Sequence, residues 1–309
     1  MSVRFFSEDS FWNTPIAEGA EIDAKSDEML QLLEKESQEG DRGFWVSLDL
    51  WTVPIYEVDE ETPLVNVQNA RWPFRQGDCF ENPVPFPMHA VPDHSRDAHI
   101  AFVDLKKRKA WDLFYVFCEE GQWKSLTGMT YSLDKDGVFD PDELNILDRD
   151  SAHFYGPSRA AAVPAIAGMI MYDEVVEGKI NHKLSFATCA NAFKQFVYPA
   201  RWTDGTIVGA GMPEGCVIQL DPELDLAQFD LSPAAMTIAR ALQEYGAVNV
   251  DVCGGKTIYA EGLYSHPTKS WKGLLEESDL TKIGMSNYRI LKLENITHKG
   301  DDRKNRATK

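Results

Sequence analysis

Short runs of alternating or β-branched apolar residues occupy the middle of the chain, from residue 43 to residue 229. Such runs are typical of strands. The clearest pair is Ile100–Asp104 and Ala110–Phe117, which the charged turn Lys106–Lys109 separates. This pattern predicts a β-hairpin, with Asp112 in its second strand.

Helical periodicity is confined to a few segments. Residues 26–36 carry Met29, Leu30 and Leu33 on one face, after a candidate capping serine, Ser26. A stronger signal follows Leu231, where a capping serine precedes a proline at the first helical position and Gly246 ends the apolar face. We therefore predict helices over residues 26–36 and 233–245.

The order of these elements predicts the fold class. Strands and helices do not alternate regularly, so a doubly wound parallel sheet is not expected. We predict a mainly β protein, an antiparallel β-sandwich or jelly roll with two or three peripheral α-helices. Residues 1–25 form an N-terminal arm, residues 26–297 a single β-sandwich domain and residues 298–309 a flexible polar tail.

The net charge restricts the partners. The chain of 309 residues has 31 Lys and Arg against 49 Asp and Glu, a formal charge of −18. A field of this sign repels nucleic acid and anionic membranes. We expect neither as a partner, and the sequence does not define the oligomeric state.

Compartment signals are weak. No apolar run is long enough to span a membrane, and the first residues lack the pattern of a signal peptide. The five cysteines form no CxxC pair, which is typical of reduced, buried thiols. These features predict a cytoplasmic protein, or a secreted one if a leader has been removed.

Titratable residues are densest between His89 and His99. Asp97 and His99 are two residues apart, so on an extended chain they project to the same side. The hairpin can bring Asp112 close to them, which would form an acid–base group. The alternatives are ordinary loop residues, or a metal site that reverses the usual His-x-Asp order.

A second candidate pairs Glu174 with His182, across the turn that contains Gly178. His182 shares its strand face with apolar neighbours, so it is either a core histidine or the wall of a pocket. Further candidates for substrate binding are Tyr155, Ser158, Arg159, Asp251 and Trp202. The guanidinium of Arg159 suits a carboxylate, and Trp202 suits a sugar face.

Several segments together resemble a broad group of uncharacterised, often secreted bacterial proteins that are rich in β structure. The resemblance rests on Phe11–Ile16, Asp97–His99, Glu174 through His182, and Met212 to Gly255. It implies no established activity, although a carbohydrate-active jelly roll fits the group. The chain has Trp111-Asp112 where such relatives usually have Tyr-Glu, so a carboxylate is kept in a shorter side chain.

These observations favour a glycoside hydrolase that acts on a neutral polysaccharide or oligosaccharide. Hydrolysis of a glycosidic bond uses two carboxyl groups. We assign the catalytic roles to Asp97 and Asp112, with His99 as a tuning group and Glu174, His182 and Asp251 in reserve. The alternatives are a polysaccharide lyase with a histidine base and Arg159 on the uronate, a non-catalytic glycan-binding module and a metal-dependent enzyme. We expect no cofactor and no metal.

Overall fold

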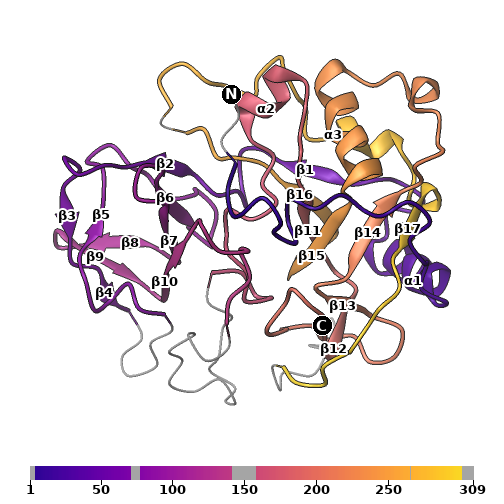
Figure 1. Cartoon of the computed structure of the whole chain (residues 1–309), viewed down its shortest axis with the longest axis horizontal. Helices are drawn as coiled ribbons and strands as arrows, with labels where there is room; N and C mark the ends of the chain where they lie inside the picture. Colours follow the sequence, from indigo (N-terminus) through magenta and orange to yellow (C-terminus); the bar gives the residue numbers. More distant parts are fainter. Residues whose placement is uncertain (1–3, 71–76, 141–157, 265, 301–309) are drawn as a thin grey trace.

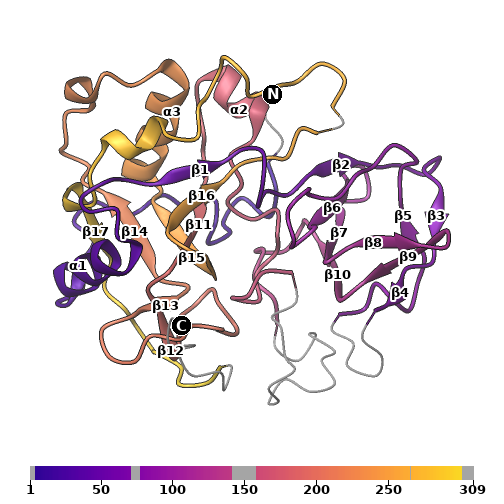
Figure 2. The ribbon, with the colours of Figure 1, turned by 180° about the vertical axis from the view of Figure 1, so that it is seen from behind.

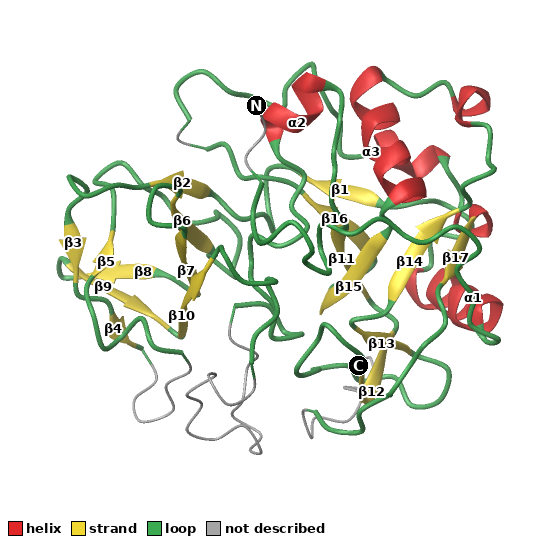
Figure 3. Ribbon diagram, viewed as in Figure 1, coloured by secondary structure: helices red, strands yellow, loops and turns green. Residues whose placement is uncertain are grey.

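The computed structural model describes residues 4–70, 77–140, 158–264 and 266–300. Strands outnumber helices, and Figure 1 shows them gathered in two lobes. The β lobe, residues 54–133, contains only strands and loops in its described part (Figure 3). The α/β lobe, residues 21–53 and 170–297, contains the α-helices of the described chain. These are α1 (Ser26–Ser37), α2 (Tyr172–Glu177) and α3 (Pro233–Glu244).

The β lobe is built around a four-stranded sheet in the order β10-β7-β6-β2. Its strands are β2 (Ile55–Glu57), β6 (Ile100–Asp104), β7 (Lys109–Phe114) and β10 (Thr127–Ser132). Two smaller sheets complete the lobe, with the orders β3-β5 and β4-β9-β8. They contain β3 (Leu64–Val65), β4 (Gln68–Asn69), β5 (Val84–Pro85), β8 (Phe117–Glu119) and β9 (Gln122–Ser125).

A six-stranded sheet in the order β1-β16-β11-β15-β14-β17 forms the centre of the α/β lobe (Figure 2). Its strands are β1 (Trp45–Ser47), β11 (Leu184–Thr188), β14 (Val217–Leu220), β15 (Ala247–Val252), β16 (Lys256–Tyr259) and β17 (Tyr288–Ile290). Helix α3 packs against β14, and α1 against β17. A separate parallel pair joins β12 (Asn191–Phe196) to β13 (Met212–Glu214). Short 3-10 helices cover Leu226–Phe229, Asp279–Lys282 and Met285–Asn287.

The three largest apolar clusters of the described residues hold the molecule together. One fills the α/β lobe, between its sheet and its helices. A second fills the β lobe around Phe102 and Leu113. The third contains Val103 of the β lobe, Ile166 of the segment between the lobes and Val250 of the α/β lobe, so apolar packing joins the lobes directly.

The structure confirms a mainly β protein with three α-helices in its described part. It does not confirm a sandwich or jelly roll. Parallel pairs such as β11 with β15 and β2 with β6 make the sheets mixed, whereas antiparallel sheets were expected. The division into an arm, one domain and a tail stays a prediction, although Trp12 of the expected arm is fully buried.

The hairpin is confirmed, with Ile100 opposite Leu113 and Asp104 opposite Lys109. Its second strand is shorter than expected, because it ends at Phe114. Tyr115 takes a left-handed backbone conformation, with φ of 57°, and donates its amide hydrogen to the Asp97 carbonyl at 2.8 Å. This turn separates β7 from β8 and brings Tyr115 beside Asp97.

Candidate functional site

A cavity of about 930 Å³ lies where the two lobes meet. The β lobe contributes Asp97, His99 and Tyr115 to its wall, and the α/β lobe contributes Trp51, Asp251 and Tyr259. Ser158 and Arg159 line it from the segment between the lobes. Five of the residues singled out in the sequence therefore surround one space: Asp97, His99, Ser158, Arg159 and Asp251.

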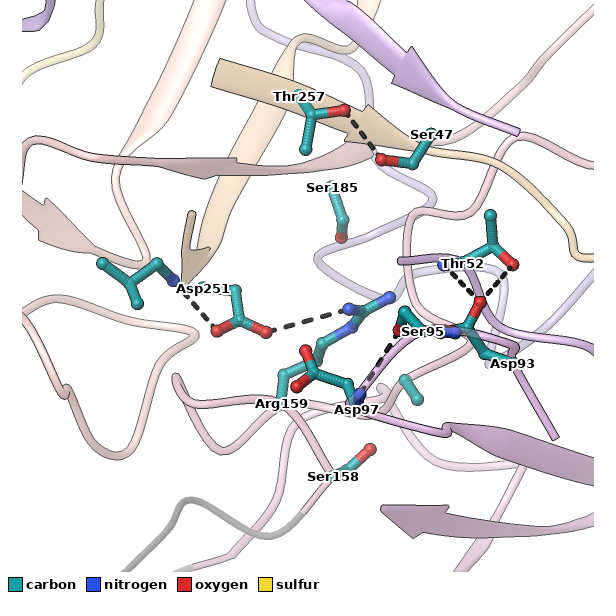
Figure 4. Close-up of polar contacts among 12 residues, drawn as sticks. Ser47, Thr52, Asp93, Ser95, Asp97, Ser158, Arg159, Ser185, Asp251 and Thr257 are labelled. Atoms are coloured by element: carbon teal, nitrogen blue, oxygen red, sulfur yellow. Dashed lines mark hydrogen bonds and ion pairs between the residues drawn. The ribbon is translucent and has the colours of Figure 1, made fainter. Parts of the chain in front are cut away.

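Arg159 is the fixed cation of this site. Only 3% of the residue is exposed, and its guanidinium carbon lies 3.8 Å from the ring centre of Tyr259, a cation–π contact. Its Nη1 atom is 3.8 Å from the Asp251 carboxylate. Figure 4 shows the carboxyl groups of Asp97 and Asp251 beside it. Arg159 thus partly balances acidic groups that reach the cavity from both lobes.

Asp251 is a carboxyl group of the cavity wall with a strongly altered acidity. Burial is the main cause, and the nearby Asp204 carboxylate adds to it, so the pKa of Asp251 rises from 3.8 to about 7. Arg159 opposes this rise. Asp251 can therefore carry or release a proton near neutral pH, which suits a general acid or base.

Asp97 is the second carboxyl group of interest. Burial raises its pKa, while Arg159 lowers it and Asp93 raises it. No described residue donates a hydrogen bond to its carboxylate, although its backbone amide donates to Ser95 Oγ at 3.3 Å. The Asp97 carboxylate is thus held in place by its backbone and remains available to a ligand.

A third carboxyl group, that of Glu214, lies outside the cavity wall. Glu214 is fully buried in β13, and its Oε1 atom accepts a hydrogen bond of 2.9 Å from Asn191. Burial raises its pKa well above the ordinary value, and the charges of Asp204 and Asp251 raise it further. Burial and the two neighbouring acids therefore disfavour the ionisation of Glu214.

His99 is a neutral imidazole in the cavity wall. The residue is 3% exposed, and burial followed by the charge of Arg159 lowers its pKa well below 6.5. Its ring lies 5.0 Å from that of Phe114. The Nδ1 atom has no hydrogen-bond partner in the described part of the chain. His99 is thus better suited to hydrogen bonding than to carrying charge.

Asp112 does not line the cavity. It is opposite Ala101 in the β6–β7 register, fully buried, and its carboxylate accepts three hydrogen bonds. The donors are Ser158 Oγ at 2.5 Å, the Ala165 amide at 2.6 Å and Tyr131 Oη at 2.7 Å. These bonds join β7 and β10 to the segment that carries Arg159, so the contacts of Asp112 are structural.

The structure places the remaining candidates elsewhere. Glu174 and His182 form a buried pair, 2.9 Å between Oε2 and Nε2, outside the cavity wall. The pair joins α2 to the residues before β11. Trp202 is 3% exposed and packs with Ala162, also outside the wall. Tyr155 lies outside the described residues.

Sequence reasoning missed several residues of the wall, above all Asp204, Tyr115 and Tyr259. Asp204 lies in an irregular loop, where an acidic residue looks like ordinary surface. In the sequence, Tyr115 looks like an ordinary strand residue, whereas in the structure the strand has already ended at Phe114. An aromatic residue that could stack on a sugar is a usable signal in the sequence, and Trp51 of the wall is such a residue.

Among the described residues, no group of three metal-binding side chains is arranged to hold an ion. No described helix is long and apolar enough to cross a bilayer. No protein-family model, curated protein or solved structure matches this chain. The site therefore has to be interpreted from its own residues.

Proposed function

We propose that the protein is a glycoside hydrolase whose active site is the cavity between the lobes. The observation that carries this proposal is a carboxyl group with a pKa of about 7, Asp251, in a cavity that a carboxylate of the opposite lobe, Asp97, also lines. Glycoside hydrolysis uses such a pair, one group protonated and the other ionised.

The two carboxyl groups have different environments. Asp251 is the general acid, because burial and Asp204 keep it protonated at a pH where ordinary carboxyl groups are ionised. Its proton passes to the glycosidic oxygen as the bond to the leaving sugar breaks. Asp97 acts on the other side of that bond, either on a water molecule or on the anomeric carbon.

Aromatic side chains supply the sugar-binding surface. Trp45 and Trp51 of the α/β lobe and Tyr115 of the β lobe all line the cavity. Their faces suit the C–H faces of a pyranose ring. The volume of about 930 Å³ is at the upper end of the range typical of small-molecule sites, enough for more than one sugar unit.

The alternative of a polysaccharide lyase has less support. A lyase needs a cation that is free to neutralise a uronate, but Arg159 is 3% exposed and stacks on the ring of Tyr259. A uronate would also meet the carboxylates of Asp97 and Asp204. The repulsion disfavours an acidic sugar at this place.

A panel of polysaccharides and oligosaccharides tests the proposal, with new reducing ends and the ultraviolet absorbance of unsaturated uronates recorded together. We expect reducing ends without absorbance, lost in Asp251→Asn and in Asp97→Asn. Asp27→Asn, an exposed substitution on α1, is the matched control and should retain activity. Absorbance would establish the lyase, and binding without turnover would establish a glycan-binding module.

A further inference from the structure

Two exposed aromatic residues face the cavity from opposite lobes. Trp51 is 46% exposed and Tyr115 40% exposed, and both line the cavity. Both also have left-handed backbones, with φ of 61° and 57°. A bulky residue adopts this conformation rarely, and such strain is concentrated at functional sites. The fold thus holds two partly exposed aromatic residues in the wall of one cavity.

The cavity wall next to Tyr115 contains an acidic residue, Asp97, and a buried polar atom without a hydrogen-bond partner among the described residues. The Tyr115 amide donates to the Asp97 carbonyl, so the two backbones are joined, and both residues line the cavity. Next to them His99 is 3% exposed, and its Nδ1 atom has no partner among the described residues. A buried polar atom without a partner in a cavity wall is typical of a group that a ligand completes.

The charges of the cavity favour a cation. Its acidic residues are Glu39, Asp97, Asp204, Asp251 and Glu277. Its basic residues are Arg96, Arg159 and Lys256. Lys256 is bound to Glu39 at 2.9 Å. With Asp251 protonated, the four other acidic residues still outnumber the three basic ones, so the wall stays negative. The chain as a whole, with a formal charge of −18, attracts a cationic polymer.

We propose that the cavity binds a glycan that carries protonated amino sugars, with the ammonium group on Asp97 and the sugar faces against Tyr115 and Trp51. An aromatic face beside a carboxylate is a combination that recognises ammonium groups, by cation–π attraction and charge pairing. This inference rests on the proposed function and narrows its substrate. It replaces the neutral glycan expected from the sequence with a cationic one.

Calorimetric binding of two matched oligosaccharides tests this inference. The probes are a glucosamine tetramer and its fully N-acetylated counterpart, both β-1,4-linked, at a pH below neutrality where the amines are charged. We expect the glucosamine tetramer to bind at least about tenfold more tightly, a difference that salt reduces. Equal affinity, tighter binding of the N-acetylated tetramer, or no binding of either would overturn the inference.

Variants locate the binding groups. Asp97→Asn should lower the affinity for the glucosamine tetramer about tenfold and leave the N-acetylated tetramer unaffected. Tyr115→Gly and Trp51→Gly remove the rings but accept the left-handed backbone, so they should weaken binding of both tetramers without lowering the melting temperature. Asp27→Asn is again the control. Unchanged affinity in Asp97→Asn and in both glycine variants would contradict the assignment.

Binding and cleavage of the glucosamine tetramer distinguish a failure of the substrate class from a failure of the proposed hydrolase. If the glucosamine tetramer binds through Asp97 but is not cleaved, the ligand class stands and the hydrolase proposal fails. If the enzyme instead hydrolyses a neutral glycan and ignores the glucosamine tetramer, the hydrolase stands and the ligand class fails.

Discussion

At the scale of single residues, Asp251 links the acidity of the site to the stability of the fold. Its pKa is raised from 3.8 to about 7, so between these values the folded chain holds a proton that the unfolded chain has released. The free energy of unfolding therefore decreases as the pH rises through this window. A protonated Asp251 is compatible with its buried, acidic surroundings, whereas an ionised one is not.

Replacing Asp251 with asparagine should remove this dependence. Asp251→Asn should gain on the order of 1–3 kcal/mol over the wild type above pH 7, with little gain near pH 4, because the amide never ionises. Thermal or urea unfolding across this range measures it. Parallel pH profiles for the two proteins would show that Asp251 keeps an ordinary acidity.

Asp112, a catalytic candidate in the sequence, has structural contacts in the fold, so its replacement should lower the stability of the protein. Asp112→Ala leaves Ser158, Tyr131 and the Ala165 amide without their acceptor, so we expect a loss of about 3 kcal/mol in unfolding free energy. Ser158→Ala removes only one donor and should cost about 1 kcal/mol. Equal stability of Asp112→Ala and the wild type by urea unfolding would contradict this account.

At the scale of elements, the ion pair between Glu174 and His182 fixes α2 to the residues before β11. Burial lowers the pKa of His182, but the Glu174 carboxylate and its hydrogen bond raise it more, so the net pKa lies above 6.5. The stabilisation is therefore fully present below pH 6.5 and is lost as the pH rises through the folded-state value.

Glu174→Gln should accordingly lower the melting temperature more below pH 6.5 than in alkaline solution. Scanning calorimetry at both ends of this range makes the comparison. Glu28→Gln, an exposed substitution in α1, is the control and should show no such difference. A loss that is the same at every pH would mean that His182 is not charged in the fold.

Helix α3 tests the clearest local prediction from the sequence. Ser232 caps it as expected, since its Oγ accepts a hydrogen bond of 3.1 Å from the Ala235 amide. Ser232→Ala should cost about 1 kcal/mol by urea unfolding. Ser278 precedes the 3-10 helix Asp279–Lys282 without a capping bond, so Ser278→Ala should be nearly neutral. If Ser232→Ala and Ser278→Ala changed the free energy of unfolding by the same amount, Ser232 would not act as a cap.

Local signals predicted elements well and their pairing poorly. The cap at Ser232 and the hairpin from Ile100 to Phe114 could be predicted, because capping and alternation depend only on residues that are neighbours in the sequence. Ser26 was expected to cap α1, but its Oγ accepts from the Ile290 amide of β17, a partner that no local pattern reveals. The parallel pairing of β11 with β15 joins segments about 60 residues apart, and no local pattern encodes it.

At the scale of the whole molecule, the site exists because the lobes meet. Asp97 and Asp251 are 154 positions apart in the sequence, and the contacts between the lobes, both apolar and polar, bring them to one cavity. The dense stretch from His89 to His99 and the segment after Ser158 identified part of the wall. Asp204 was not predicted, because its effect on the pKa of Asp251 depends on the proximity of the two residues in the fold, and no local sequence pattern indicates that proximity.

The most direct test of the account is the pH dependence of reducing-end release from a cleaved glycan, for the wild type and for Asp251→Asn. We predict that kcat/KM of the wild type falls as the pH rises above about 7, where Asp251 loses its proton. The variant should be at least about a hundredfold slower, without that fall. Turnover in the variant at the wild-type rate, with the same profile, would show that Asp251 is not the acid.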